Sequence, residues 1–181
     1  KSQALDALEA IEVDYQENEP VLDIKKAVED SSPLVWPQNG TNECFFWSKG
    51  EQSKVCNLQE RARFLIKGNF RIPIAAANPI EPRGCLVEYK GDNELVLIAP
   101  VQSPWKVRQI LACQSLRWPE RNLEVRVPEI GGSFGMKGQT YNEYAVCLWA
   151  ARKLKRSIKW VATRAESFLA DDQGRNVLVE A

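Results

Sequence analysis

The residues best placed for chemistry lie in a glycine-rich stretch, residues 128–138, which reads PEIGGSFGMKG. Four of the ten glycines of the chain fall in it, so much of its backbone carries no side chain. Its N–H groups can therefore come close to an anionic group, and a helix that begins soon after it would add a partial positive charge. The stretch indicates a cradle for an anion or a cofactor. A tight connection between a strand and a helix would also explain these glycines.

The glycine spacing matches neither common phosphate-binding motif. Gly131, Gly132, Gly135 and Gly138 do not give G-x-G-x-x-G, and Lys137 is not followed by the serine or threonine of a P-loop. Any specificity of this loop for a ligand must therefore come from residues in other parts of the chain.

The chain has no histidine among its 181 residues. This excludes Ser-His-Asp and Cys-His nucleophile systems, zinc sites with histidine ligands and a histidine general base. The cysteines form none of the C-x-x-C pairs that zinc and iron–sulfur sites favour. They are Cys44, Cys56, Cys85, Cys113 and Cys147. We interpret Cys113 and Cys147 as small core residues of helices, and the odd, dispersed set favours a reducing compartment, here the cytoplasm.

Composition and charge narrow the class of protein. The hydrophobic fraction of 44% and the charged fraction of 27% are those of an ordinary globular protein. The 24 basic and 24 acidic residues give no net charge, so nothing favours nucleic acid or an anionic membrane as the main partner. No apolar run approaches the roughly 20 residues that a membrane-spanning helix needs.

The elements next to the loop can be predicted from periodicity. Residues 123–127 alternate apolar and charged side chains, which is typical of a half-buried strand. After the loop, Thr140 and Glu143 have the spacing of a capping box at the start of a helix. The apolar stripe of that helix is Tyr144, Cys147, Leu148, Ala151 and Leu154.

Other elements are expected on both sides of this unit. Residues 61–74 and 84–98 are strand-like, with a hairpin turn at residues 91–94 inside the second run, and residues 158–161 form a further strand. Ser103 as N-cap and Pro104 at the first position start a helix, and a second capping box lies at Thr163 and Glu166. The fold class is α+β, or mixed α/β.

The first 30 residues form a separate small unit in this interpretation. A helix over residues 2–10, a strand over residues 11–15 and a short helix capped by Asp23 are too few to bury a core unaided. Residues 31–59 are predicted to be an extended connecting segment whose aromatic side chains lie across a neighbouring surface. The remaining domain then comprises residues 60–181.

Three stretches, in this order and spacing, resemble a known family. They are residues 78–84 (NPIEPRG), 100–105 (PVQSPW) and 127–137 (VPEIGGSFGMK). They resemble the large, molybdopterin-binding subunit of the xanthine dehydrogenase and aldehyde oxidase family of molybdenum hydroxylases. Residues 160–166 (WVATRAE) and 10–15 (AIEVDY) are also similar, the latter to the end of the family's α/β hammerhead domain.

The resemblance implies roles for particular residues. In the family, the glutamine at the position of Gln102 hydrogen-bonds an oxygen on molybdenum, and the phenylalanine at the position of Phe134 brings its backbone amide to the metal's ligands. The neighbouring loop positions line the cofactor: Gly131, Gly132, Ser133 and Gly135. The resemblance also implies that residues 1–30 end a hammerhead-like unit and that residues 60–181 are the N-terminal part of the first molybdopterin-binding domain. Molybdenum is then held by the pterin, while the protein supplies amide donors, which suits a chain without histidine.

The sequence departs from the family pattern at several positions. Ser133 replaces a glycine, and Met136 stands where glycine is frequent. Gly138 takes the place of a glutamate that binds substrate in the purine-oxidising branch, so xanthine is not the expected substrate. Residues 75–77 are alanines where the family has a histidine. In the family, the glutamate that acts as the general base lies in a C-terminal G-x-G-E-like segment, and no such segment is found before Ala181.

We therefore expect the chain to be part of a hydroxylase that inserts a water-derived oxygen into an aldehyde or an aromatic N-heterocycle, and to be inactive alone. The resemblance implies a molybdopterin cofactor in a dinucleotide form, with FAD and 2Fe-2S clusters on partner domains or subunits, and a partnership with the remaining molybdopterin-domain polypeptide. The alternative is a non-catalytic scaffold piece with the same fold and no bound metal.

Overall fold

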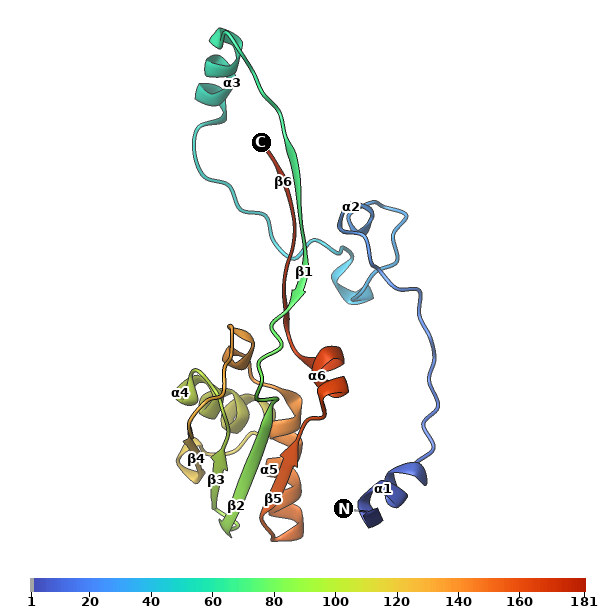
Figure 1. Cartoon of the computed structure of the whole chain (residues 1–181), viewed down its shortest axis with the longest axis vertical. Coiled ribbons are helices and arrows are strands. Elements are labelled where there is room, and N and C mark those ends of the chain that lie inside the picture. The colour runs from blue at the N-terminus through green and yellow to red at the C-terminus, as the bar shows by residue number, and fades with distance from the viewer. Residues whose placement is uncertain (1) are drawn as a thin grey trace. The chain divides into compact units, whose positions relative to one another are not determined.

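The strands and helices fall into two units, which the computed structural model describes over residues 2–181. One unit comprises the chain up to Phe70 together with Leu178–Ala181, and the other comprises Arg71–Val177. Figure 1 shows the elements of both units. Helices and strands occur together, which confirms the predicted α+β class. Within residues 2–181, no helix is long and apolar enough to cross a membrane.

A four-stranded sheet lies at the centre of the second unit, with the strand order β4-β3-β2-β5. Strands β2 (Gly84–Gly91) and β3 (Glu94–Ile98) pair antiparallel as a hairpin whose turn lies at the predicted residues 91–94. Strand β5 (Ile158–Val161) extends the sheet antiparallel to β2, and β4 (Leu123–Arg126) lies parallel to β3. The strands predicted before the glycine-rich loop and at residues 158–161 are both confirmed.

The crossover between the parallel strands β3 and β4 is helical. It begins with α4 (Pro104–Gln109), in which Pro104 takes the first helical position as predicted. The side chain of Ser103 makes no cap hydrogen bond, so the predicted cap is wrong in this respect. A π-helical segment, η2 (Ile110–Ser115), and a 3-10 turn, η3 (Glu120–Asn122), complete the crossover.

Helix α5 (Asn142–Leu154) packs against the sheet, and Figure 1 shows it alongside β2 and β5. The predicted stripe is buried except for Leu154, which is 58% exposed at the helix end. Cys147 is buried as predicted, whereas Cys113 is exposed, because η2 does not keep the 3.6-residue period by which its face was assigned. The core comprises Cys85, Val87, Leu95, Leu97, Ala99, Val101, Val107, Leu111, Ala112, Trp118, Leu123, Tyr141, Tyr144, Cys147, Leu148 and Ala151.

The two predicted capping boxes have different outcomes. Helix α6 (Arg164–Ala170) begins with the predicted box: Thr163 Oγ1 accepts from the Glu166 amide at 3.2 Å, and the Glu166 carboxylate accepts from the Thr163 amide at 2.6 Å. The box predicted at Thr140 and Glu143 is wrong, because the Glu143 carboxylate binds a buried arginine instead.

That arginine, Arg83, joins three elements of the second unit. It is fully buried, and its two terminal nitrogens donate to the two carboxylate oxygens of Glu143 at 3.0 Å each. Its Nε donates to Asp171 at 2.5 Å, and its guanidinium carbon lies 3.7 Å from the centre of the Tyr141 ring. Burial opposes the charge of Arg83, but the hydrogen bonds that it donates to Glu143 and Asp171 outweigh this effect and raise the pKa of Arg83. The start of β2, the first turn of α5 and the end of α6 are therefore held together by one side chain.

The first unit contains short helices joined by irregular chain. Helices α1 (Ser2–Glu9) and α2 (Ile24–Ala27) agree with the prediction, and the Asp23 carboxylate caps α2 by accepting from the amides of Lys25 and Lys26. The strand predicted at residues 11–15 is wrong: these residues have no regular structure. A strand is stable only where a neighbour pairs its backbone groups, and no strand among the described residues does so here.

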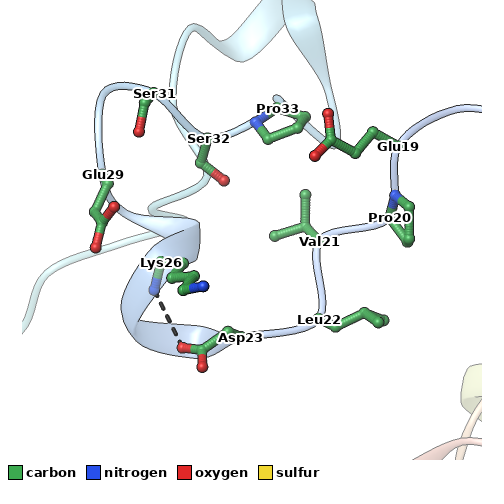
Figure 2. Close-up of a pocket in the computed structure, with 10 residues that line it drawn as sticks. All are labelled: Glu19, Pro20, Val21, Leu22, Asp23, Lys26, Glu29, Ser31, Ser32 and Pro33. Atoms are coloured by element: carbon green, nitrogen blue, oxygen red, sulfur yellow. Dashed lines mark hydrogen bonds between the residues drawn. The ribbon is translucent and has the colours of Figure 1, made fainter.

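The turn after α2 is held by one asparagine. The Nδ2 of Asn42 donates to the carbonyl oxygens of Ala27 at 2.8 Å and Pro33 at 2.9 Å, and its Oδ1 accepts from the amide of Val35 at 2.9 Å. A hollow of about 360 Å³ lies beside this turn, lined by residues between Glu19 and Pro33. Figure 2 shows the residues that line it. The Asn42 contacts therefore give the irregular segment a defined path.

Two predicted boundaries before the sheet need correction. Helix α3 (Gln52–Arg61) occupies the end of the segment predicted to be extended, residues 31–59, since glutamine, lysine, leucine, glutamate and arginine all favour helix. The strand predicted over residues 61–74 accordingly begins later, as β1 (Asn69–Ala76). Strand β1 pairs with β6 (Gln173–Glu180) in a two-stranded sheet.

The Arg83 contacts predict a large stability effect. Arg83→Ala leaves the carboxylates of Glu143 and Asp171 without their cation, and breaking such a buried pair costs about 3–5 kcal/mol. The hydrogen exchange rates of the α5 and β5 amides should rise accordingly. Arg126→Ala is the control, because Arg126 pairs at 2.7 Å with an exposed carboxylate, that of Glu124, and surface pairs contribute about 0–1 kcal/mol. Equal effects of the two variants would contradict the role of Arg83.

Candidate functional site

The glycine-rich loop connects β4 to α5, as predicted, and its backbone turns sharply. Gly132, Phe134 and Gly135 have φ angles of +95°, +51° and +99°, in the left-handed region that side chains with a Cβ disfavour. The loop then closes in a 3-10 turn, η4 (Met136–Gly138). These turns expose Phe134, whose side chain is 80% accessible.

The loop leaves a run of backbone donors unused. The amides of Gly131, Met136, Lys137 and Gly138 donate to oxygens of the chain. By contrast, four consecutive amides between them have no hydrogen-bond partner among the described residues. They belong to Gly132, Ser133, Phe134 and Gly135. A row of free N–H groups on an accessible loop can bind oxygen acceptors of a ligand.

A buried lysine fixes this loop to the residues after β1. Lys137 is fully buried, and its Nζ donates to Glu81 Oε2 at 2.6 Å. The same carboxylate oxygen accepts from the Gly131 amide at 2.8 Å, and the Glu81 amide donates to the Gly131 carbonyl oxygen at 3.2 Å. A Cβ on Gly131 would lie 2.6 Å from the Cβ of Glu81, so this approach requires glycine. Both ends of the loop are thus bound to Glu81.

The ionisation of Glu81 depends on these contacts. Desolvation disfavours its charged form, but the hydrogen bonds from Lys137 Nζ and the Gly131 amide outweigh desolvation and hold the pKa of Glu81 below its ordinary value of 4.5. The carboxylate is therefore charged at neutral pH and can bind the Lys137 ammonium.

A second cation holds the segment that carries Glu81. The Arg164 guanidinium, on α6, donates to Asn78 Oδ1 at 2.7 Å and to the carbonyl oxygens of Pro79 at 2.8 Å and Ile80 at 2.7 Å. Pro79 in turn lies 3.3 Å from the position that a Cβ on Gly132 would occupy. The stretches 78–84, 127–137 and 160–166, which carry the family resemblance, are thus in physical contact.

The structure brings Gln102 to the glycine-rich loop. Its backbone amide donates to the Lys137 carbonyl oxygen at 3.0 Å, and its side-chain Oε1 accepts from the Ser133 hydroxyl at 2.7 Å. The side chain is exposed, and its amide nitrogen has no hydrogen-bond partner among the described residues. Gln102 therefore adds a side-chain donor beside the four free backbone amides.

A cleft of about 410 Å³ lies on one side of the loop. Its lining includes Phe134 and Gly135 but not Gln102 or the other predicted site residues. The rest of the lining is Ala75, Ala76, Ala77, Met136, Gln139, Asp172, Gln173, Gly174 and Arg175. Tyr141 fixes this wall, because its hydroxyl donates to the Met136 carbonyl oxygen at 2.8 Å and accepts from the Asp172 amide at 3.1 Å.

The sequence predicted the donors of this site but missed the residues that hold them. Glu81, Lys137 and Arg164 belong to the stretches that carry the resemblance, yet no role was assigned to them. A buried lysine and a carboxylate 56 positions apart leave no periodic signal, so only the tertiary structure pairs them. Within the described residues, no group of three or more cysteine, aspartate and glutamate side chains could hold a metal ion.

Comparisons with known proteins identify relatives of this chain. The chain is 28% identical to the large chain of carbon monoxide dehydrogenase from Hydrogenophaga pseudoflava, over 91% of this chain and 22% of that protein. It is 29% identical to the large subunit of nicotine 6-hydroxylase from Paenarthrobacter nicotinovorans, over 99% of this chain and 22% of that protein. The chain thus spans about a fifth of the length of the curated relatives it matches.

A solved structure has the same fold. Quinoline 2-oxidoreductase from Pseudomonas putida 86 superposes with a TM-score of 0.86 at 27% identity, over 97% of this chain and 22% of that one. The profile of the molybdopterin cofactor-binding domain matches residues 35–181. The chain therefore belongs to the molybdopterin cofactor-binding domain family, as its resemblance to the large subunits of molybdenum hydroxylases predicted.

Proposed function

We propose that this chain is part of a molybdenum-dependent hydroxylase and that its glycine-rich loop binds the molybdopterin cofactor. The binding residues in this proposal are Gln102, Gly131, Gly132, Ser133, Phe134 and Gly135, with Gln102 and Phe134 nearest the metal. The observation that carries it is the row of four free backbone amides, residues 132–135, beside the unpaired side-chain NH₂ group of Gln102. Family membership supplies the identity of the ligand.

The donor set suits a cofactor that brings its own metal ligands. Molybdopterin holds molybdenum through its dithiolene sulfurs and presents oxygen acceptors, so the protein needs donors rather than metal-binding side chains. The described residues offer such donors and no cluster of metal-ligating side chains. When bound, the molybdenum centre supplies oxygen transfer to the substrate and accepts its electrons. The part of this chain is to bind the cofactor, orient it and place fixed dipoles beside it.

The proposed substrate is an aldehyde or an aromatic N-heterocycle. Relatives are named for carbon monoxide, nicotine and quinoline, which differ widely in size and polarity. Position 138 is a glycine here, and a Cβ at that position would lie 3.4 Å from Gln102 Oε1, so this position beside Gln102 carries no acid. This supports an aldehyde or an N-heterocycle that needs no acidic contact at position 138 over a purine that a carboxylate there would hold.

The remaining parts of the enzyme are proposed from the relatives. Because the chain spans about a fifth of them, the general base and a second cofactor wall belong to further molybdopterin-domain polypeptide. FAD and 2Fe-2S clusters on partner domains or subunits would carry electrons away, and the cofactor would be a dinucleotide form. We further propose a cytoplasmic location, residues 1–30 as the end of a hammerhead-like unit, residues 31–59 as a connecting segment, and residues 60–181 as the N-terminal part of the cofactor domain.

Metal analysis of the complex tests the proposal directly. The protein purified from its source with all partner chains should contain stoichiometric molybdenum and a pterin dinucleotide. A complex that folds and assembles but lacks molybdenum would instead support the non-catalytic scaffold.

The loop geometry predicts that Gly135→Val abolishes molybdenum retention. Gly135 has φ +99°, which a β-branched residue resists, although no atom within 4 Å would block its Cβ. The loop must then change its path, and the free amides lose their alignment. Gly91→Val is a matched control, since Gly91 also has open space but no positive φ. Molybdenum content per complex is the measurement, and a normal content in Gly135→Val would rule out the cradle.

The Glu81 contacts predict an acid limit for the loop. Since its pKa in the folded protein is lowered from 4.5, the Glu81–Lys137 pair stabilises the loop above that pH and is lost as pH falls through the lowered pKa. Glu81→Gln should destabilise the loop by about 1–3 kcal/mol at neutral pH, because it leaves Lys137 buried without a counter-charge. It should also abolish the acid transition.

Hydrogen exchange of the hydrogen-bonded loop amides, those of Gly131 and residues 136–138, measures both effects between roughly pH 3 and 7, the range that includes carboxyl titration. Glu124→Gln, which alters an exposed ion pair with Arg126, is the control and should change neither. An acid transition that survives Glu81→Gln would assign it to another carboxylate.

Gln102→Ala is predicted to lower turnover by about two to three orders of magnitude. A preorganised donor beside developing charge is worth roughly 2.7–4 kcal/mol in other enzymes, and the backbone amides that bind the cofactor remain. Gln102→Glu should be as damaging, because an ionised carboxylate only accepts hydrogen bonds. Turnover and molybdenum content of the reconstituted complex are measured together. Near-normal turnover of Gln102→Ala at full molybdenum content would remove Gln102 from the site.

A further inference from the structure

The hydroxyl of Ser133 sits between two other groups of the site. It donates to Gln102 Oε1 at 2.7 Å and accepts from the backbone amide of Lys137 at 3.1 Å. The carbonyl oxygen of Lys137 also accepts a hydrogen bond from the backbone amide of Gln102 at 3.0 Å. Ser133, Gln102 and the Lys137 peptide therefore form one closed set of hydrogen bonds.

The direction of these hydrogen bonds sets the orientation of the Gln102 amide. The Lys137 N–H can only donate, so it takes an acceptor position of the Ser133 hydroxyl. The hydroxyl proton then points to an acceptor, and the carbonyl side of the Gln102 amide supplies it. If the amide flipped, its NH₂ group would compete with the Lys137 amide for the acceptor positions of the hydroxyl, and the hydrogen bond from the hydroxyl to Gln102 Oε1 would be lost.

We infer that Ser133 is a positioning residue, which holds the Gln102 side chain with its Oε1 on the Ser133 hydroxyl and its NH₂ group free to donate to the cofactor. The inference deepens the proposed function and rests on it, because the NH₂ group matters only if Gln102 faces the cofactor. A glycine at position 133, the residue that the family resemblance would place there, offers no such hydroxyl. The Ser133 hydroxyl thus fixes the orientation of the Gln102 side-chain amide, which a glycine at this position could not do.

The hydrogen bond between Ser133 and Gln102 differs from an ordinary surface contact, because buried Lys137 holds it in place. Its Nζ is fixed by Glu81 at 2.6 Å, so the amide that directs the Ser133 hydroxyl belongs to a fully buried residue. Rotation of the hydroxyl away from Gln102 would leave Gln102 Oε1 without its protein donor. The orientation of Gln102 is therefore coupled to the buried end of the loop.

The midpoint potential of the molybdenum centre in the assembled holoenzyme tests this without a known substrate. Reduction adds negative charge, so an oriented NH₂ donor beside the cofactor stabilises the reduced state. Ser133→Ala should shift the potential to a lower value, in the same direction as Gln102→Ala but by less, at unchanged molybdenum content. Ser133→Thr keeps the hydroxyl and should restore the wild-type potential. Adding Ser133→Ala to Gln102→Ala should cause no further shift.

These variants separate the positioning role of Ser133 from the proposed cofactor site. A shift in Gln102→Ala but none in Ser133→Ala would overturn the positioning role and leave the proposed function intact. The positioning role would also be overturned if Ser133→Ala shifted the potential of the Gln102→Ala variant as much as it shifts that of the wild type. The hydroxyl would then act independently of Gln102. An assembled complex without molybdenum would refute the proposed cofactor site itself, and the positioning role with it. No shift in either single variant at full molybdenum content would remove Gln102 from the site and overturn the positioning role.

Discussion

The buried contact between Lys137 and Glu81 is the interaction on which the site depends. An ammonium that is fully buried has to meet a charge or several acceptors, and Glu81 is the carboxylate that reaches it, at 2.6 Å. Because Glu81 also accepts from the Gly131 amide, one carboxylate fixes both ends of the loop. The backbone N–H groups of residues 132–135, between those ends, can then stay without hydrogen bonds to the loop's own carbonyl oxygens. A loop held only by its own turns would satisfy such donors internally.

Local chemistry of the sequence predicted the parts of the fold that depend on near neighbours. The capping box at Thr163 and Glu166, the cap of Asp23 and the hairpin turn at residues 91–94 all use groups within a few positions of each other. The glycine-rich loop falls in the same class, since strand, loop and helix follow in sequence. In each case the physical signal and the residues that produce it share one short stretch.

Long-range partners account for most of what the sequence could not predict. Thr140 and Glu143 have the spacing of a capping box, but Arg83, 60 positions away, binds Glu143 more strongly than a helix amide could. The strand expected at residues 11–15 has alternating side chains but no neighbouring strand among the described residues. The predicted donors Gln102 and Phe134 came from resemblance, whereas the contacts that hold them, through Glu81, Ser133 and Arg164, came only from the structure.

A site built from backbone donors depends on residues that fix the path of the chain, and these residues can lie away from the ligand. A side chain that binds a metal can adjust its rotamer, but an amide points where the chain path sends it, so the path itself must be rigid. Here Gly132 and Gly135 permit the path through their positive φ angles, while Glu81 and Arg164 hold it from outside. Residues outside the proposed cofactor contacts therefore specify the path of the loop as strictly as the glycines within it. This is why the contacts within the stretches 78–84, 127–137 and 160–166 carry more information about the site than the glycines alone.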